Sequence, residues 1–600
     1  MLYFKNEQEK RLYEGIMEKA DACFDREVMM PREWRGENGY HSCLVNQYVH
    51  STNASFLYAY ELMNRGREED CRCAEEILRR VLPLQDTDPE HDTYGIWSYF
   101  LEESLDEMNP PDWNWADFCG KRLLQIYVEF GHLLSEEVRE MVRSAVIHAC
   151  NSIIRRNMGP HYTNISIMGT LVTMAAGENL KEERLMDYAK ERLKKLYDFN
   201  MGHGCYQEYN SPSYTWVVID DIASMIGLIH DEESVRMFKD LNDLAWRCIA
   251  EHFHYKTKQW AGPHARFYAM LEDDQLLMRI QRSLNYRIRL LDLEKEGLAE
   301  HLPLGFFSFD CVCPKEFERY FVTPNEEASV DAMFVQDEKA ENREIAVCFQ
   351  SEDYTLGTFY RSIFWNQRRN HISYFGTEEA PVYCGLKCLH DGYDYSSGLI
   401  VTAQDGARTV SAIGFGTNGG DTHCGLDLVK DATISAEDIR VRFEIGGAVD
   451  SVQLEQTDER TFLLKAAGLT LRIRFPYAAF GREKVYFRIT EEKEHVNETG
   501  GHKDVFCAKC IDAVLYSGER KRICFTELEE CCCAVSFEIV PKGGEFRPAA
   551  EAGVENGMLT VKQDGLAVQA LAAACTMEGF RQQARAWRDG KEYLEIYGGL

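Results

Sequence analysis

A carboxylate and three tyrosines gather around a Ser-Pro turn at residues 204–216. Pro212 fixes its own φ and biases the residue before it away from helical geometry, whereas no Gly or Pro interrupts residues 215–226. We therefore expect Glu208 and Tyr214 at the mouth of a helix. A carboxyl group there can give a proton to a leaving group, and a phenol can act as an acid or a base. The alternative is an aromatic lid with a purely structural role.

Two tryptophans and two aspartates follow directly on a Pro-Pro turn at residues 110–111. Sugar rings present C–H faces that stack on indoles, and neighbouring carboxylates and amides bind sugar hydroxyl groups. Trp113 and Trp115 are therefore candidate substrate-binding residues. Asp112 is a candidate general base, with Asp117 as its reserve. The alternative is that the two tryptophans are buried in the core beneath the turn and have only a structural role.

Two further polar loops precede helical patterns. Asn164 ends the first loop, where it would either bind substrate or cap the helix that follows. The second loop follows a Gly-Pro pair and carries His264 and Arg266. The planar fork of Arg266 matches a carboxylate, and His264 could bind a hydroxyl group or transfer a proton. The alternative for Arg266 is an ordinary surface ion pair with a nearby carboxylate.

The first half of the chain has the period of an α-helix. In residues 135–156, apolar residues such as Val138, Val142 and Ala149 share one stripe, and Ser135 is placed to cap the helix. Such patterns, joined by loops of mixed length, predict a stack of helix hairpins. The expected helices are 6–25, 53–66, 68–83, 114–130, 135–156, 164–177, 185–196, 214–229, 232–252 and 272–285.

Past about residue 305 the apolar period changes from that of a helix to two. Val441 and Phe443, for example, alternate with Arg440 and Arg442. Many short strands without helices between them predict an antiparallel sandwich, with one short helix at 577–588 near the end of the chain. The sequence therefore predicts an α+β multidomain protein with a helical domain at 1–304 and an antiparallel β-sandwich domain at 305–600.

Composition narrows the class of protein. The formal charge is 67 − 98 = −31, which argues against nucleic acid or an anionic membrane as a partner, because phosphate binding needs clustered lysine and arginine. One or two arginines in a cleft can still bind a carboxylate.

The N-terminus has no leader pattern, and no stretch approaches about 18 apolar residues, so we expect a cytoplasmic protein. The scattered cysteines indicate reduced thiols; Cys507 and Cys510 have metal-knuckle spacing without a second pair.

A helical half followed by a β half of this size resembles the heparinase II/III-like polysaccharide lyases and the similarly built (α/α)-barrel β-glucuronidases. The resemblance implies an (α/α) toroid whose loops form a sugar cleft, with the sandwich as a further wall. It also implies that Asn164 neutralises a substrate carboxylate and that His371, from a strand edge of the sandwich, binds substrate. The histidine that often follows the asparagine in such lyases is absent, since Ile165 stands there.

Two reactions on uronic-acid-containing oligosaccharides fit these residues. In the first, preferred interpretation the protein is an exo-acting glycoside hydrolase of the β-glucuronidase kind. Its catalytic pair would be Glu208, an acid whose pKa is raised by partial burial, and Asp112, a base that activates water.

In the second interpretation the protein is a lyase that acts by β-elimination. Tyr214 would then be the base or acid, and Asn164 and Arg266 would neutralise the uronate. His264 or His371 would take the complementary role. A third hypothesis is a carbohydrate-binding scaffold without activity. In each case the expected partner is an acidic oligosaccharide; no cofactor or metal is expected, and a homo-oligomer is left open.

Overall fold

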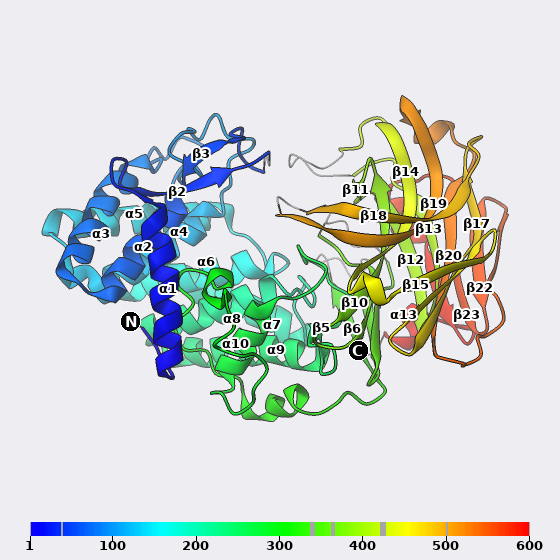
Figure 1. The fold of residues 1–600 in the computed structure, drawn as a ribbon. Helices are drawn as coiled ribbons and strands as arrows, with labels where there is room; N and C mark the ends of the chain where they lie inside the picture. Colours follow the sequence, from blue (N-terminus) through cyan, green and yellow to red (C-terminus); the bar gives the residue numbers. More distant parts are fainter. Residues whose placement is uncertain are drawn as a thin grey trace. The chain divides into compact units, whose positions relative to one another are not determined.

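The computed structural model describes residues 2–37, 40–335, 343–361, 367–419, 428–499 and 502–598. The chain divides into two compact units (Figure 1). The helical unit comprises residues 1–208, 214–247 and 273–318, and the β unit comprises 209–213, 248–272 and 319–600. The sequence placed a single division at 304/305. The structure instead divides the chain at 318/319, and it assigns two short segments from the helical half of the sequence to the β unit.

The helical unit is an (α/α) toroid of helix hairpins. The pairs α2–α3, α4–α5 and α6–α7 pack as hairpins, and α2, α4, α6 and α8 contact one another in that order. Helix α6 is buried on every side from residue 163 to residue 177, which places it in the inner row. The helices are α1 (Glu7–Cys23), α2 (Thr52–Arg65), α3 (Glu68–Val81), α4 (Trp115–Gln125), α5 (Glu136–Arg156), α6 (Thr163–Asn179), α7 (Glu183–His203), α8 (Tyr214–Met225), α9 (Glu232–His252), α10 (Asp274–Ser283) and α11 (Leu298–His301).

Local sequence signals account for these helices. The side chain of Ser135 accepts a hydrogen bond from the backbone N–H of Val138 and so caps α5, whose predicted apolar stripe is buried. Gly204 ends α7 in the left-handed region, φ 65°, which is a common way to end a helix. The predicted helices are confirmed; the largest difference is at α7, which continues to His203, beyond the predicted end at residue 196.

A small antiparallel sheet in the helical unit was not predicted. It consists of β1 (Phe24–Asp25), β2 (Met30–Arg35) and β3 (Gln47–His50). These strands are too short for their period to stand out from the surrounding helical patterns. Strand β3 leads directly to Ser51, the N-cap of α2.

The β unit stacks antiparallel sheets. Within the described residues its largest sheet has nine strands, in the order β18-β19-β14-β10-β9-β8-β7-β6 with β11 on β10; a six-stranded sheet follows the order β12-β13-β20-β17-β16-β15. The bounds are β6 (Ala328–Val335), β7 (Arg343–Gln350), β8 (Tyr354–Phe359), β9 (His371–Gly376), β10 (Pro381–His390), β11 (Tyr393–Asp394), β12 (Gly398–Asp405), β13 (Arg408–Phe415), β14 (Thr433–Gly447), β15 (Gln453–Asp458), β16 (Thr461–Ala466), β17 (Leu469–Phe480), β18 (Tyr486–Thr499), β19 (His502–Cys524) and β20 (Cys531–Pro541).

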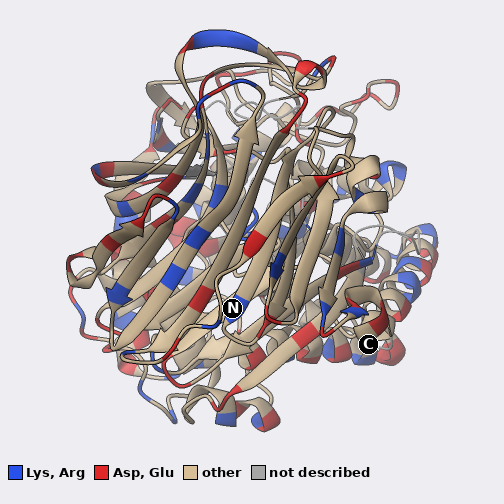
Figure 2. Cartoon of the chain, turned by 90° about the vertical axis from the view of Figure 1, so that its right-hand side faces the viewer, with Lys and Arg blue, Asp and Glu red and all other residues tan. Residues whose placement is uncertain are grey.

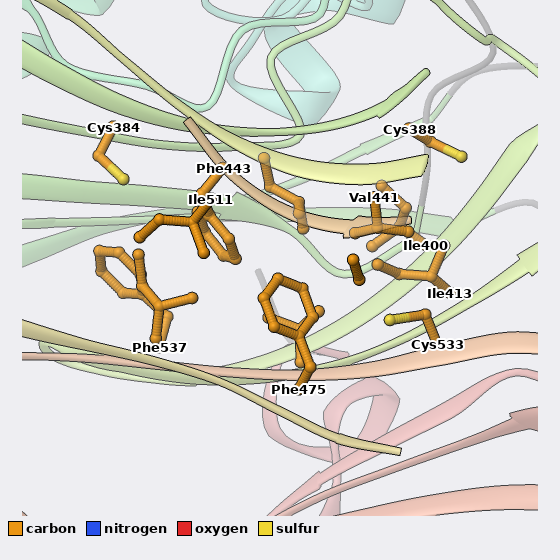
Figure 3. Close-up of a cluster of buried hydrophobic side chains, with 14 of the residues drawn as sticks. Cys384, Cys388, Ile400, Ile413, Val441, Phe443, Phe475, Ile511, Cys533 and Phe537 are labelled. Carbon is orange, nitrogen blue, oxygen red and sulfur yellow. The ribbon is translucent and has the colours of Figure 1, made fainter. Parts of the chain in front are cut away.

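The main core lies between these two sheets. Val441 and Phe443 of β14 face Phe475 of β17 and Phe537 of β20 (Figure 3). The rings of Phe443 and Phe537 stack with their centroids 5.6 Å apart. The alternation predicted from the sequence for these strands is thus confirmed, and with it the sandwich.

A third layer, which the sequence did not predict, covers the outer face of the six-stranded sheet. On β13, Ile413 belongs to the main core, whereas Val410 and Ala412 belong to a second core with Val561 and Val568. Both faces of β13 are therefore buried. The layer is a sheet of β21 (Glu551–Glu555), β22 (Met558–Gln563), β23 (Leu566–Leu571), β24 (Arg585–Arg588) and β25 (Lys591–Glu592).

The predicted helix at 577–588 is shorter than expected. Helix α12 (Met577–Gln583) ends before β24, which pairs with β23. A two-stranded hairpin, β4 (Phe253–His254) with β5 (Gln259–Trp260), also lies in the half predicted to be helical and belongs to the β unit. The chain ends with α13 (Tyr593–Ile596).

The surface charges of the β unit are mixed and the described cysteines form no disulfide bonds, so packing stabilises the fold. Figure 2 shows acidic and basic residues interspersed along the strands of the β unit. The cysteines that the structure describes are free thiols. Cys507 is exposed and Cys510 is buried on β19, because residues three apart on a strand point to opposite faces. In the described part of the chain, no His, Cys, Asp and Glu side chains group as a metal site would, and no helix has the length and apolar character needed to cross a membrane.

Candidate active site

The N-termini of successive inner helices are tied together at one end of the helical unit. Trp115, the first residue of α4, donates from Nε1 to Oγ1 of Thr52, the first residue of α2, at 3.1 Å. Asn114 just before α4 donates from Nδ2 to the hydroxyl group of Tyr162 just before α6, at 3.2 Å. Polar loops that are distant in sequence therefore meet at this end of the toroid.

Glu208 and Asn164 form the tightest of these links. Oε2 of Glu208 accepts from the backbone N–H of Asn164 at 2.9 Å and from its Nδ2 at 2.7 Å. The backbone N–H of Glu208 donates to Oγ1 of Thr163 at 3.2 Å. The side chains of Asn164 and Glu208 are buried.

This arrangement changes the predicted cap of α6. The sequence suggested that Asn164 caps the helix, but Tyr162 occupies the N-cap position and makes no capping bond. The first backbone N–H groups of a helix have no partner within it. Glu208 supplies one from another loop, and the positive end of the helix dipole stabilises its carboxylate.

Asp112 is held by a phenol and by its own loop. Its Oδ2 accepts from the hydroxyl group of Tyr99 at 2.6 Å, and its Oδ1 accepts from the backbone N–H of Asn114 at 2.9 Å. Burial and the Asp112 carboxylate together raise the pKa of Tyr99 well above its ordinary value, so this phenol stays protonated. Asp112 therefore uses both oxygens within the protein.

The two tryptophans after the Pro-Pro turn differ in their surroundings. Trp115 stacks on Tyr99 with ring centroids 3.9 Å apart and an interplanar angle of 30°. Trp113 donates from Nε1 to the carbonyl oxygen of Asp92 at 2.8 Å. Both rings are half-exposed. They are therefore placed to offer part of a ring to a ligand, and a fully buried core anchor is excluded.

Asp117 lies deeper, in the first turn of α4. Burial raises its pKa to about 7, against the opposing effect of Arg192 and Arg156. Its Oδ1 has no hydrogen-bond partner among the described residues. A Cβ on Gly169 of α6 would lie 2.5 Å from that oxygen and 3.2 Å from Nη1 of Arg192, so the glycine makes room for both groups.

Tyr214 is the first residue of α8 and is half-buried. The helical unit thus gathers an amide, phenols, carboxylates and two half-exposed indoles at the N-terminal ends of α2, α4, α6 and α8. Backbone N–H groups and helix dipoles at such ends favour a negatively charged ligand. The predicted residues Asp112, Trp113, Trp115, Asn164, Glu208 and Tyr214 belong to this set.

The remaining predicted residues belong to the β unit. His264 is fully buried; its Nδ1 lies 2.8 Å from the carbonyl oxygen of Asn210, and burial lowers its pKa to about 3. Arg266 is also buried and donates from Nε to Oε1 of Gln367 at 2.5 Å. These contacts are internal to the β unit.

His371 is a core residue, which corrects its expected position at a strand edge. Strand β9 pairs with both β8 and β10, so it lies inside the nine-stranded sheet. The imidazole packs edge-on against Phe443 and Phe537, with centroid distances of 5.6 and 4.8 Å, and its Nε2 lies 3.1 Å from Oγ1 of Thr409. Burial lowers its pKa to about 3, so the ring is neutral inside the sandwich. It cannot reach a substrate from there.

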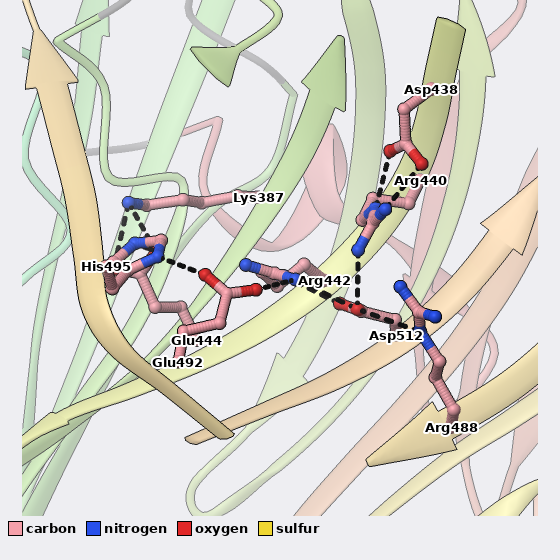
Figure 4. A network of polar contacts seen from close by, with 9 residues as sticks. All are labelled: Lys387, Asp438, Arg440, Arg442, Glu444, Arg488, Glu492, His495 and Asp512. Carbon is pink, nitrogen blue, oxygen red and sulfur yellow. Dashed lines mark hydrogen bonds and ion pairs between the residues drawn. The ribbon is translucent and has the colours of Figure 1, made fainter. Parts of the chain in front are cut away.

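A second polar cluster, which the sequence did not reveal, lies on the other face of the nine-stranded sheet (Figure 4). Glu444 is fully buried. Lys387 Nζ lies 2.9 Å from both of its oxygens, and Nε2 of His495 lies 2.7 Å from Oε2. Arg442 binds Asp512 from the same face, with Nε 2.7 Å from Oδ1. In the sequence, Arg442 and Glu444 alternate with apolar residues, as residues on the solvent-exposed face of a strand do.

Opposite charges set the ionisation of this cluster. Burial alone would raise the pKa of Glu444, but Lys387 and His495 hold it well below its ordinary value. Burial would lower the pKa of His495, but Glu444 and Glu492 raise it. The cluster therefore pairs charges with charges.

The chain matches a domain family of unknown function, and it is similar to solved structures of low sequence identity. A domain family of unknown function, DUF8769, matches residues 21–279, less than half of the chain. No curated protein sequence matches.

Several solved structures are similar to the chain. A chondroitin AC lyase of Streptomyces coelicolor A3, in complex with chondroitin sulphate, has 9% identity and a TM-score of 0.48 over 94% of this chain and 84% of that one. A heparinase III, the BT4657 gene product, has 8% identity and a TM-score of 0.34 over 95% and 91%. The heparan sulfate lyase HepC of Pedobacter heparinus has 10% identity and a TM-score of 0.33 over 87% and 81%. These proteins are polysaccharide lyases, the class that the sequence resembles.

Proposed function

We propose that the protein is a lyase that cleaves uronic-acid-containing oligosaccharides by β-elimination. The observation that carries this proposal is the pairing of Glu208 with Asn164. One oxygen of Glu208 accepts both the backbone N–H and the side-chain N–H of Asn164. That oxygen is occupied by the two N–H groups, and it fixes the orientation of the amide.

The oriented amide suits a lyase. An amide nitrogen carries two hydrogens, and Asn164 uses one of them on Glu208. The second donates to no residue that the structure describes. We assign it to the substrate carboxylate, whose neutralisation acidifies the proton on the adjacent carbon. The N-terminal ends of the inner helices add favourable potential for the same group.

The chemical step then needs a group that moves one proton. We assign Tyr214 to it: as the phenolate, it takes the proton from the carbon next to the carboxylate, and the electron pair forms a carbon–carbon double bond as the bond to the departing sugar oxygen breaks. The phenol then gives that proton to the departing oxygen, which returns Tyr214 to the phenolate. Trp113 and Trp115 bind the sugar rings beside this point. His264 and His371 have no role in this proposal, because both are buried and neutral.

Hydrolysis is the second candidate, and Asp117 is the observation that favours it. A buried carboxyl with a pKa of about 7 is the kind of group that acts as a general acid. Asp112, the nearby partner, would serve as the base. Against this, both oxygens of Asp112 accept hydrogen bonds from the protein.

One assay separates the two reactions. The protein is incubated with oligosaccharides of heparan sulfate, chondroitin, hyaluronan, alginate and polygalacturonate, and absorbance in the near ultraviolet is followed together with new reducing ends. A lyase produces both signals in equal molar amounts, because each cleavage leaves one conjugated double bond. New reducing ends without absorbance would overturn the lyase in favour of the hydrolase.

A further inference from the structure

The β2–β3 hairpin of the helical unit carries an exposed aromatic pair. Trp34 and Tyr48 are directly opposite in the antiparallel register, so both side chains lie on the same face. Their side chains are 59% and 56% exposed, and the ring centroids are 5.1 Å apart at an interplanar angle of 75°. Exposed tryptophan and tyrosine side by side are unusual on a protein surface and indicate a binding site.

A guanidinium without a charged partner lies on the same face. Arg32 is two residues before Trp34 on β2, and its Cζ lies 4.6 Å from the centroid of the Tyr48 ring. Within the described part of the chain, its guanidinium makes no hydrogen bond or ion pair. Its neighbour Arg35, by contrast, points to the opposite face, where it covers Phe100 and donates to the carbonyl oxygen of Tyr40. In a chain with a formal charge of −31, an unpaired exposed arginine beside two aromatic rings is a specific local feature.

The hairpin is continuous with the candidate active site. Strand β3 runs from Tyr48 through His50 to Ser51, and the next residue, Thr52, accepts the hydrogen bond from Trp115. The backbone N–H of Thr52 also donates to the carbonyl oxygen of Tyr99 at 3.0 Å. At the rise of an extended strand, three or four residues span on the order of 10 Å. An oligosaccharide of a few sugar units covers such a distance.

We propose that Arg32, Trp34 and Tyr48 form a secondary subsite that binds an acidic oligosaccharide beyond the point of cleavage. This inference rests on the proposed function for the identity of the ligand. The rings of Trp34 and Tyr48 stack on C–H faces of the sugar, and Arg32 binds a carboxylate or sulfate on the same chain. The charge of Arg32 and the continuity with the candidate active site favour this ligand over an apolar partner.

The experiment measures binding and turnover as a function of chain length. Hexasaccharides and disaccharides of heparan sulfate, chondroitin, hyaluronan, alginate and polygalacturonate are titrated into the wild type by calorimetry. Tryptophan fluorescence is recorded in parallel, with Trp34→Phe identifying the signal of Trp34. The variants are Trp34→Ala, Tyr48→Ala and Arg32→Gln. Tyr486→Ala is the matched control, because Tyr486 is also exposed and lies near an arginine, Arg488.

The expected result is a loss that depends on chain length. Trp34→Ala and Tyr48→Ala each weaken hexasaccharide binding about tenfold and raise its KM by a similar factor, with kcat and disaccharide turnover unchanged. Arg32→Gln weakens binding of the acidic hexasaccharides and lowers its salt dependence, but leaves neutral cellohexaose unaffected. Tyr486→Ala behaves as the wild type. Circular dichroism checks that the variants are folded.

Three outcomes would overturn the subsite. They are unchanged hexasaccharide binding in Trp34→Ala, no binding of any of these hexasaccharides by the wild type, and a wild-type dimer in sedimentation equilibrium that Trp34→Ala dissociates. The last would assign the patch to a second copy of the chain. If the hexasaccharides bind through Trp34 but no unsaturated product forms, the subsite stands and the lyase proposal fails. If product forms but the variants bind normally, the lyase stands and the subsite fails.

Discussion

The two polar clusters of this protein are built from different groups. At the end of the toroid where the inner helices begin, the carboxylates of Asp112 and Glu208 accept hydrogen bonds from neutral donors. These donors are a phenol, an amide and backbone N–H groups. On the nine-stranded sheet, Glu444 is bound by Lys387 and His495, which are formally cationic. We infer a different role for each arrangement.

Paired charges satisfy each other and need no ligand. In the β unit they hold strands β10, β14 and β18 together, and Glu444 is fully buried. Neutral donors orient a carboxylate but leave its charge in place, and an amide such as Asn164 retains a free N–H for a ligand. The two clusters therefore differ in what they leave for a ligand: the charges on the sheet are already paired, whereas the proposed site keeps its carboxylate charge and a second amide N–H.

The largest effect expected is on catalysis by Tyr214. Replacing it with Phe removes the group that moves the proton, so Tyr214→Phe should lower kcat by about 10²- to 10⁴-fold. Kinetics of the near-ultraviolet product measure this loss.

Tyr206→Phe in the same loop is the matched control. The Tyr206 hydroxyl group donates to the carbonyl oxygen of Leu241 at 2.5 Å, so its loss should affect stability by about 1 kcal/mol and leave kcat alone. Wild-type kcat in Tyr214→Phe would remove the phenol from the mechanism.

The structural cluster should respond in the opposite way. Lys387→Met leaves the buried carboxylate of Glu444 without its lysine, which should destabilise the β unit by about 3–5 kcal/mol. Denaturant unfolding followed by hydrogen exchange on β10 and β14 measures the loss. The double variant Lys387→Met/Glu444→Gln should recover much of it, because the group that has lost its lysine is then uncharged. Additive losses in the double variant would show that the two groups are not coupled.

Glu208 separates the two reactions with a smaller effect. Glu208→Gln keeps an oxygen that can accept both N–H groups of Asn164, so we expect a loss in kcat of less than about tenfold, whereas a general acid would lose about 10²- to 10⁴-fold. Glu208→Ala removes the cap of α6 and should cost about 0.5–2 kcal/mol of stability. A loss of several orders of magnitude in Glu208→Gln, confined to substrates with poor leaving groups, would restore the hydrolase.

The smallest effect is the pH dependence of the β unit. The folded pKa of Glu444 is lowered, so its stabilising contribution is present above its ordinary value of 4.5 and is lost as the pH falls through the folded pKa. The folded pKa of His495 is raised, so its contribution is full below its ordinary value of 6.5 and is lost as the pH rises through the folded pKa.

The β unit should therefore be most stable between about pH 4.5 and 6.5 and should weaken on the alkaline side. The stability of β14 and β18, measured by hydrogen exchange from below about pH 4.5 to above about pH 6.5, tests the acid and alkaline slopes. His495→Gln should flatten the alkaline limb and leave the acid limb in place. An unchanged alkaline limb in that variant would assign the slope to other groups.

Local patterns in the sequence were enough for the helical half and for the two-sheet sandwich, but not for the third sheet layer or the short strands of the helical half. The apolar stripe and the Ser135 cap define α5, and the alternation of Val441 and Phe443 defines β14, because both periods follow from backbone geometry alone. The same reasoning placed Asp112, Asn164 and Tyr214 at helix starts, since turn residues directly precede the helical patterns. None of these patterns shows which helices begin at the same end of the toroid.

Tertiary structure alone decided which polar residues are buried and what they bind. Arg442 and Glu444 alternate with apolar residues as a solvated face would, yet the nine-stranded sheet buries both. His371 belongs to an interior strand because β8 and β10 pair on either side of it. Glu208 caps a helix that begins 45 residues earlier in the chain, at Thr163. Periodicity reports one face of one element, whereas burial depends on which other elements cover that face, and those contacts join residues far apart in sequence.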